Sequence, residues 1–363
     1  MRSIGILALA LLLAACSGAA ASPAPASAPA PASSGAAAAP AASSGHALPR
    51  ALAALVDQAR REGRAVIYGV ASTPAEEEAI ERAFADYYGF GLDLSFETGL
   101  HPQKVAELVN LGRSGVPSGI DLFWSSDLMT NQLDQAGLLH DAAWLEPLGL
   151  APDETMLHGQ SIWIHDSFLV NVLYNTQKVT AADAPHRYQD LLQPRWQGAI
   201  VAPRTPSQMV YLTYVYGEDA ATELAEGLVK QRIAFVPTYP DATARVAAGE
   251  YLLGIGQHAE REGRKGAPLA DAPLDVGIVI PWGMVLLADA EHPAAATLVA
   301  YFLSTPEGQH AIDQTWAISR TSSPDTALWR VAQGKELKRV PLDWLEREQT
   351  RLQRKYADVL GIR

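Results

Sequence analysis

The chain has 363 residues and a formal net charge of −12, and 48% of its residues are hydrophobic and 19% charged. This composition is that of a globular protein, unlike a disordered chain or a protein with many membrane spans, and the length predicts about two domains. The acidic excess repels nucleic acids and anionic bilayers, so we expect no nucleic-acid partner.

The N-terminus has the pattern of an export signal. Arg2 precedes an apolar run over residues 4–13, which is about half of the roughly 20 residues needed to cross a bilayer. Leu13-Ala14-Ala15-Cys16 resembles the lipobox of bacterial lipoproteins. This resemblance implies that residues 1–15 are a signal peptide and that Cys16, the one cysteine, carries a lipid. A lone cysteine excludes an intramolecular disulfide and a thiolate zinc site.

Residues 16–46 are almost wholly Ala, Pro, Ser and Gly after the cysteine. Such a segment cannot bury enough apolar surface to offset its ordering entropy, so we expect a disordered tether. The predicted location is periplasmic, with the lipid anchored in a membrane that faces the periplasm. In an organism without an outer membrane, the protein would lie on the cell surface.

From residue 47 onward, apolar periodicity alternates between strand and helix, and a parallel, open α/β arrangement is expected. A loop-rich stretch interrupts the pattern before residue 168. The expected strands are 65–70, 92–96, 120–124, 168–174, 199–202, 251–256 and 276–280. The expected helices are 51–62, 74–88, one from 102, one from 125 to about 136, one after 207, 294–302, 307–313 and a charged tail from 328.

Small hydroxyl residues follow several of these strands. In open α/β sheets, ligands lie beyond the carboxyl ends of strands, where helix N-termini present free N–H groups. Ser and Thr are also preferred helix N-caps, so a structural role and a ligand contact both stay open for each. The residues concerned are Ser72, Thr73, Thr98, Ser125, Ser126, Thr205 and Ser207.

A series of short motifs across residues 63–320 resembles the type 2 periplasmic binding proteins related to ferric-iron-binding components of ABC transporters. The order and spacing of the motifs carry this resemblance. They are Tyr174-Asn175-Thr176, Arg195-Trp196-Gln197-Gly198, Gly249-Glu250-Tyr251, Pro281-Trp282-Gly283, His292-Pro293-Ala294 and Thr305-Pro306-Glu307-Gly308-Gln309.

The resemblance implies a two-lobed α/β fold, each lobe an open, mostly parallel sheet flanked by helices, with two hinge strands near residues 168 and 281. Lobe one would comprise residues 47–167 plus 281–315, and lobe two residues 168–280 plus 316–363. A small-molecule solute would bind between the lobes and be captured by hinge closure. The partner would be an ABC permease in the inner membrane, and we expect a monomer.

The motif that follows the Gly-Glu pair determines the expected ligand. Ferric-binding relatives typically place two adjacent tyrosines there, whereas this chain has Gln257 and His258. We therefore expect no metal site and a small polar or anionic solute. Arg204, just before a helix, has a guanidinium suited to a carboxylate, phosphonate or sulfonate; a solvated loop arginine is the alternative.

Several further side chains are candidate ligand contacts. Gln257 and His258 offer neutral hydrogen bonds at a strand end, and the alternative, which the residue type favours for His258, is a structural role. Trp124 and Trp282 can stack on a ligand or fill the lobe interface, and His101 precedes Pro102 near another strand end.

Motifs of catalysis are missing from the sequence. There is no phosphate-binding loop, nucleophile elbow or zinc-protease motif. Residues 254–259 match a dinucleotide-binding fingerprint. The fingerprint requires an acidic residue at the end of the next strand, whereas Asp275 lies before the expected strand 276–280. We expect neither an enzyme nor a cofactor. Two alternative functions stay open: a ferric-iron-binding protein, and a ligand-sensing accessory protein for a membrane sensor kinase.

Overall fold

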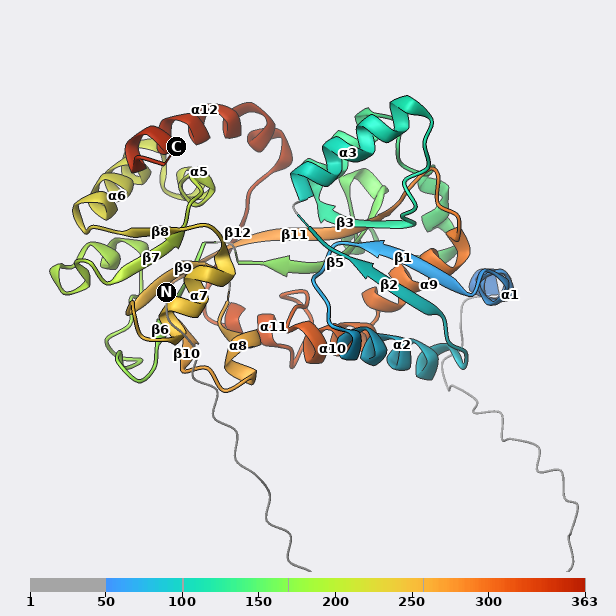
Figure 1. The fold of residues 1–363 in the computed structure, drawn as a ribbon, viewed down its shortest axis with the longest axis horizontal. Coiled ribbons are helices and arrows are strands. Elements are labelled where there is room, and N and C mark those ends of the chain that lie inside the picture. The colour runs from blue at the N-terminus through green and yellow to red at the C-terminus, as the bar shows by residue number, and fades with distance from the viewer. Residues whose placement is uncertain (1–49, 100, 169, 257, 363) are drawn as a thin grey trace, which may run out of the picture. The chain divides into compact units, whose positions relative to one another are not determined.

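Two β-sheets, each flanked by helices, organise the chain (Figure 1). The computed structural model describes residues 50–99, 101–168, 170–256 and 258–362, which lie in a single compact unit. The predicted signal peptide, the tether, Cys16 and Gln257 lie outside the described residues. Across the described ranges, every helix is too short or too polar to cross a membrane.

The first sheet has seven strands in the order β2-β1-β3-β11-β5-β4, and β12 pairs with β11. The pairs β1–β2, β1–β3 and β11–β12 are parallel, and the others are antiparallel. The strands are β1 (Arg64–Tyr68), β2 (Asp93–Glu97), β3 (Leu122–Ser126), β4 (Thr155–Met156), β5 (Ser161–Ser167), β11 (Val276–Leu286) and β12 (Glu336–Arg339).

The second sheet has five strands in the order β10-β6-β9-β7-β8. Strand β7 is parallel to β8 and β9, whereas β6 is antiparallel to β9 and β10. The strands are β6 (Asn171–Asn175), β7 (Ile200–Pro203), β8 (Ala234–Val236), β9 (Leu253–Gly256) and β10 (Leu269–Asp271).

Both sheets are mixed, which corrects the expectation of mostly parallel sheets. The chain passes from β5 in the first sheet to β6 in the second within a few residues, and it returns from β10 to β11. Parallel neighbours need a long crossover connection, usually a helix. Strands next to a direct passage between the sheets are free of this requirement. Each antiparallel pair includes one of these strands, β5, β6 or β11.

Helices cover the sheets. The α-helices are α1 (Arg50–Glu62), α2 (Pro74–Tyr88), α3 (His101–Ser114), α4 (Asp127–Gln135), α5 (Ser207–Tyr216), α6 (Glu218–Lys230), α7 (Tyr239–Ala247), α8 (Glu260–Arg264), α9 (Pro293–Ser304), α10 (Pro306–Trp316), α11 (Ala327–Ala332) and α12 (Leu342–Leu360). Short 3-10 turns lie at Ala142–Leu148, Pro152–Glu154, Leu157–Gly159, Tyr188–Leu192 and Pro194–Trp196.

Each sheet has its own hydrophobic core. Trp124 and Trp316 belong to the main core beside the seven-stranded sheet, whereas Tyr188 and Tyr356 belong to the core of the five-stranded sheet. The C-terminal region therefore contributes to both cores, with α10 in the first and α12 in the second. The residue ranges of the two predicted lobes stay a prediction.

Strand β5 of the seven-stranded sheet was not predicted from the sequence. The prediction of a loop-rich stretch before residue 168 was wrong here. The strand has a short apolar centre, but His165 and Asp166 follow it and are buried as well. Buried polar residues interrupt the apolar run that marks a strand. Strand β12 was likewise predicted as part of a helical tail.

Candidate ligand-binding site

Three aromatic side chains from neighbouring strands lie together in the seven-stranded sheet. Trp124 of β3, His165 of β5 and Trp282 of β11 are all at least partly buried. The Trp124 and His165 ring centroids are 5.1 Å apart. The rings of His165 and Trp282 are stacked, with centroids 5.7 Å apart and an interplanar angle of 21°.

A β-bulge between β5 and β11 determines this arrangement. The pairing runs from Gly283 opposite Trp163 to Trp282 opposite His165, so one extra residue stands on β5. A bulge redirects the side chains that follow it, and here it places His165 beside Trp282. Gly283 is required at the bulge, because a Cβ there would lie 2.8 Å from the Ile162 carbonyl oxygen.

His101, at the start of α3, closes one side of this group. Its ring centroid is 5.2 Å from that of Trp282 and 5.4 Å from that of Tyr68. Its Nε2 lies 3.1 Å from the carbonyl oxygen of Trp124, which accepts the hydrogen bond. Burial lowers the pKa of His101, so the ring favours the neutral form.

His258 follows β9 of the five-stranded sheet and lies near enough to His165 for a charge on its ring to affect the pKa of His165. Burial lowers the pKa of His165 to about 3, and repulsion from His258 and then His101 adds to the effect. Burial lowers the pKa of His258 to about 4. This electrostatic effect is the reason to group His258 with the rings of the seven-stranded sheet. We call His101, Trp124, His165, His258 and Trp282 the histidine–tryptophan cluster.

Four nitrogens of this cluster lack a hydrogen-bond partner. Trp124 Nε1, His165 Nδ1, His258 Nδ1 and Trp282 Nε1 are buried, and none is bonded to another described residue. A buried donor or acceptor left unsatisfied costs about 1–3 kcal/mol, and such groups are rare in folded proteins. Four in one place are therefore the arrangement expected of a site that binds a hydrogen-bonding ligand.

Helix α8, two residues after His258, is attached to the helices of the seven-stranded sheet. Arg261 Nη2 lies 3.0 Å from Glu76 Oε1, at the start of α2. Arg264 Nη2 lies 2.9 Å from Asp313 Oδ2 on α10, and Asp313 is buried. We call these two ion pairs the α8 contacts. They hold the segment that carries His258 against the half that carries the rest of the cluster.

Two predicted residues of the first loop serve the local structure near the cluster. Thr73 is the N-cap of α2 and forms a capping box with Glu76. Ser72 Oγ accepts a hydrogen bond of 3.3 Å from Trp316 Nε1. The ring centroids of Trp316 and Trp124 are 6.0 Å apart. Trp316 therefore connects Ser72 to the cluster. Thr98 is exposed at the end of β2.

Ser125 and Ser126 adjoin the cluster along β3, where they pair with Gly283 and Trp282, whereas Thr205, Ser207 and Arg204 belong to the five-stranded half. Ser125 lies inside β3 rather than at a helix start, and its Oγ is 2.8 Å from Thr130 Oγ1. Thr205 Oγ1 donates to Ser207 Oγ over 3.0 Å at the start of α5. Arg204 is exposed. Among the described residues, Arg204, Thr205 and Ser207 form no hydrogen bond or ion pair with the cluster.

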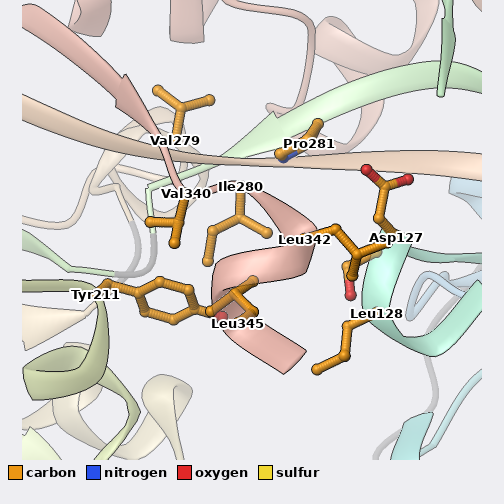
Figure 2. Close-up of a pocket in the computed structure, with 10 residues that line it drawn as sticks. Asp127, Leu128, Tyr211, Val279, Ile280, Pro281, Val340, Leu342 and Leu345 are labelled. Atoms are coloured by element: carbon orange, nitrogen blue, oxygen red, sulfur yellow. The ribbon is translucent and has the colours of Figure 1, made fainter. Parts of the chain in front are cut away.

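Ser126 lies on a separate, mostly apolar pocket beside β11 (Figure 2). Leu128 of α4, Tyr211 of α5 and Leu345 of α12 face this pocket, and burial raises the pKa of Tyr211 to about 12. The remaining lining residues are Asp127, Val279, Ile280, Pro281, Val340 and Leu342. We call it the hinge pocket, because β11 is one of the strands that join the two sheets.

His165 is the cluster residue that the sequence did not single out. It lies in the strand that was predicted as a loop, with no motif around it. The weak signal was the polar pair His165-Asp166 directly after the apolar Ile162-Trp163-Ile164. Only the strand pairing shows that both polar residues point into the protein. His101, Trp124, His258 and Trp282 were candidates, and the structure brings these four together.

Comparisons with known proteins agree with this fold. Residues 115–346 match the family described as bacterial extracellular solute-binding protein. No curated protein sequence matches the chain.

Three similar solved structures illustrate the likeness. Iron-bound HitA from Pseudomonas aeruginosa has a TM-score of 0.61 and 20% identity, over 81% of this chain and 98% of that one. The substrate-binding protein of an ABC transporter from Agrobacterium tumefaciens has a TM-score of 0.66 and 16% identity, over 82% and 94%. AfuA from Actinobacillus pleuropneumoniae, with exogenous fructose-6-phosphate bound, has a TM-score of 0.59 and 19% identity, over 83% and 100%. The likeness confirms the predicted type 2 periplasmic binding protein fold.

The lowered imidazole pKa values predict that acid destabilises the protein. An unfolded histidine binds a proton near pH 6.5, whereas folded His165 and His258 do so near pH 3 and 4. The unfolded state then holds more protons, so the free energy of unfolding falls as the pH falls below about 6.5. Each histidine contributes up to about 1.4 kcal/mol per pH unit in this window.

Chemical denaturation between about pH 7.5 and 4.5 measures this effect. His165→Gln should lose stability less steeply than the wild type, whereas His310→Gln, at an exposed position, should follow the wild type. Equal slopes for the three proteins would contradict a buried, neutral His165.

Proposed function

Because this chain belongs to the bacterial extracellular solute-binding proteins, we propose that it is the receptor of an ABC importer. In this proposal, a small polar or anionic solute is captured in the histidine–tryptophan cluster. The observation that carries the proposal is the set of four buried, unpartnered nitrogens, three from the seven-stranded sheet and one from the segment after β9. Proteins of this family bind solutes outside the cytoplasm, and binding rather than turnover is the activity we assign.

Delivery to a permease is the second part of the proposal. The similar structure from Agrobacterium tumefaciens is the substrate-binding protein of an ABC transporter, which supports this assignment. A monomeric receptor, held at a membrane by lipid on Cys16 and by the tether of residues 16–46, would meet the permease at the membrane surface.

Hinge closure is the third part. The two halves would be the predicted lobes, and β11 would be one of the hinge strands. The α8 contacts support closure, since they join the segment that carries His258 to α2 and α10. Asp313 is buried, and Arg264 also bonds to Glu260 over 3.0 Å. Charge-assisted bonds in such surroundings are stronger than exposed ion pairs.

The full-length protein should be stabilised by its solute, since a ligand that binds only the native state raises its stability. A panel of carboxylates, phosphonates, amino acids, sugars and ferric citrate is the first screen, with the melting temperature as readout. At a concentration of about 100 Kd, a ligand adds about 2.7 kcal/mol. His165→Gln should reduce the shift, and His310→Gln should retain it.

If no compound of the panel raises the melting temperature, the proposed function is contradicted. A visible phenolate-to-iron absorption band on adding ferric citrate would instead favour iron binding over an organic solute.

Loss of the α8 contacts should favour an open form. Replacing both arginines (Arg261→Gln with Arg264→Gln) removes the charges that face Glu76 and Asp313. We expect a larger radius of gyration by small-angle X-ray scattering and weaker solute binding. Arg82→Gln is the matched control, because it breaks the exposed Arg82–Glu78 pair within α2. Unchanged scattering and unchanged binding in the double variant would show that the α8 contacts play no part in closure.

A further inference from the structure

We infer that the solute of the histidine–tryptophan cluster is uncharged and rich in hydroxyl or carbonyl oxygens, as a free sugar or polyol is. The inference rests on the proposed function and narrows the class of solute. It is drawn from the hydrogen-bonding atoms of the cluster, from the charges around it and from its rings.

The available atoms match hydroxyl groups. The indole nitrogens of Trp124 and Trp282 only donate hydrogen bonds, so they need oxygen acceptors. The Nδ1 atoms of His165 and His258 donate or accept, depending on the tautomer of each neutral ring. A hydroxyl group donates and accepts, so it satisfies either tautomer. A fully ionised carboxylate or phosphate only accepts hydrogen bonds, so it suits only the tautomer whose Nδ1 carries the proton.

The cations near the cluster are already paired with carboxylates. Lys104, whose Nζ lies 5.2 Å from the centroid of the Tyr68 ring beside His101, is paired with Glu107. The cations that act on His258 are Arg264 and Arg261. Arg261 is paired with Glu76, and Arg264 with both Asp313 and Glu260. The positive charge is thus already balanced by carboxylates of the described residues.

The histidines do not supply this charge at neutral pH, because burial keeps their pKa values low. Burying an ionised group without a partner costs several kcal/mol. Arg204, predicted to hold an anionic group, is exposed at the end of β7 instead.

A cationic solute fits the same atoms poorly. An ammonium group carries only donors, and it would face the two indole N–H groups. The carboxylates nearby are occupied by Arg261 and Arg264. An ammonium ion would have to displace one of the α8 contacts to gain a counter-charge.

The rings supply the apolar part of the site. His101 stands edge-on to Tyr68 and Trp282, and Trp282 is only partly buried. Sites for small molecules combine mostly apolar and aromatic walls with a few placed polar groups. The C–H faces of a sugar ring can cover such rings while its hydroxyl groups reach the four nitrogens.

The test compares solutes of similar size and different charge on the full-length protein near pH 7.5. Small-molecule extract of bacterial cells is separated by ion exchange into uncharged, anionic and cationic fractions. Glucose, gluconate and glucosamine serve as a defined set beside them. The readouts are the melting temperature and the mass of any bound molecule by non-denaturing mass spectrometry.

We expect stabilisation by the uncharged fraction and an uncharged bound molecule. In His258→Gln the affinity for that fraction should fall about tenfold, as loss of one buried hydrogen bond predicts, and His310→Gln should bind as the wild type does. Stabilisation by only the anionic or only the cationic fraction would overturn this inference and leave the proposed function standing. No stabilisation by any fraction would count against both.

Discussion

The pairing of β5 with β11 across a bulge is the constraint on which the candidate site depends. The extra residue on β5 brings His165 opposite Trp282, and Gly283 allows the two backbones to approach there. Without this bulge, the alternation of a strand would send His165 to the other face of the sheet. The site is thus set by backbone geometry at a strand that also joins the two halves of the chain.

The same geometry links recognition to closure. His258 completes the cluster from the five-stranded half, and the helix that follows it is held by ion pairs to α2 and α10. The carboxylate of Glu76 both bonds to the backbone N–H of Thr73 and pairs with Arg261. A solute that bonds to nitrogens of both halves would therefore favour the same closed arrangement as these contacts, and binding energy and closure would be coupled.

Much of the fold was predictable because local signals and global packing agree. The expected helix 74–88 matches α2, whose start has the capping pattern of Thr73, Pro74 and Glu76, and the motif series identified the fold. The site was only partly predictable. His101, Trp124, His258 and Trp282 stood near the ends of strands or helices as expected from the sequence, although Trp124 and Trp282 lie inside β3 and β11; His165 has no such marker. Its position follows from long-range strand pairing, which a single sequence does not reveal.

Nuclear magnetic resonance of the indole N–H groups tests the central claim most directly. In the full-length protein with ¹⁵N-labelled tryptophan, Trp124→Phe and Trp282→Phe assign two signals. On adding a solute that raises the melting temperature, these two signals should shift. The signal of Trp196, whose Nε1 is also buried and unpartnered among the described residues but lies in the other core, should stay in place. Shifts confined to other tryptophans would contradict a binding site at the histidine–tryptophan cluster.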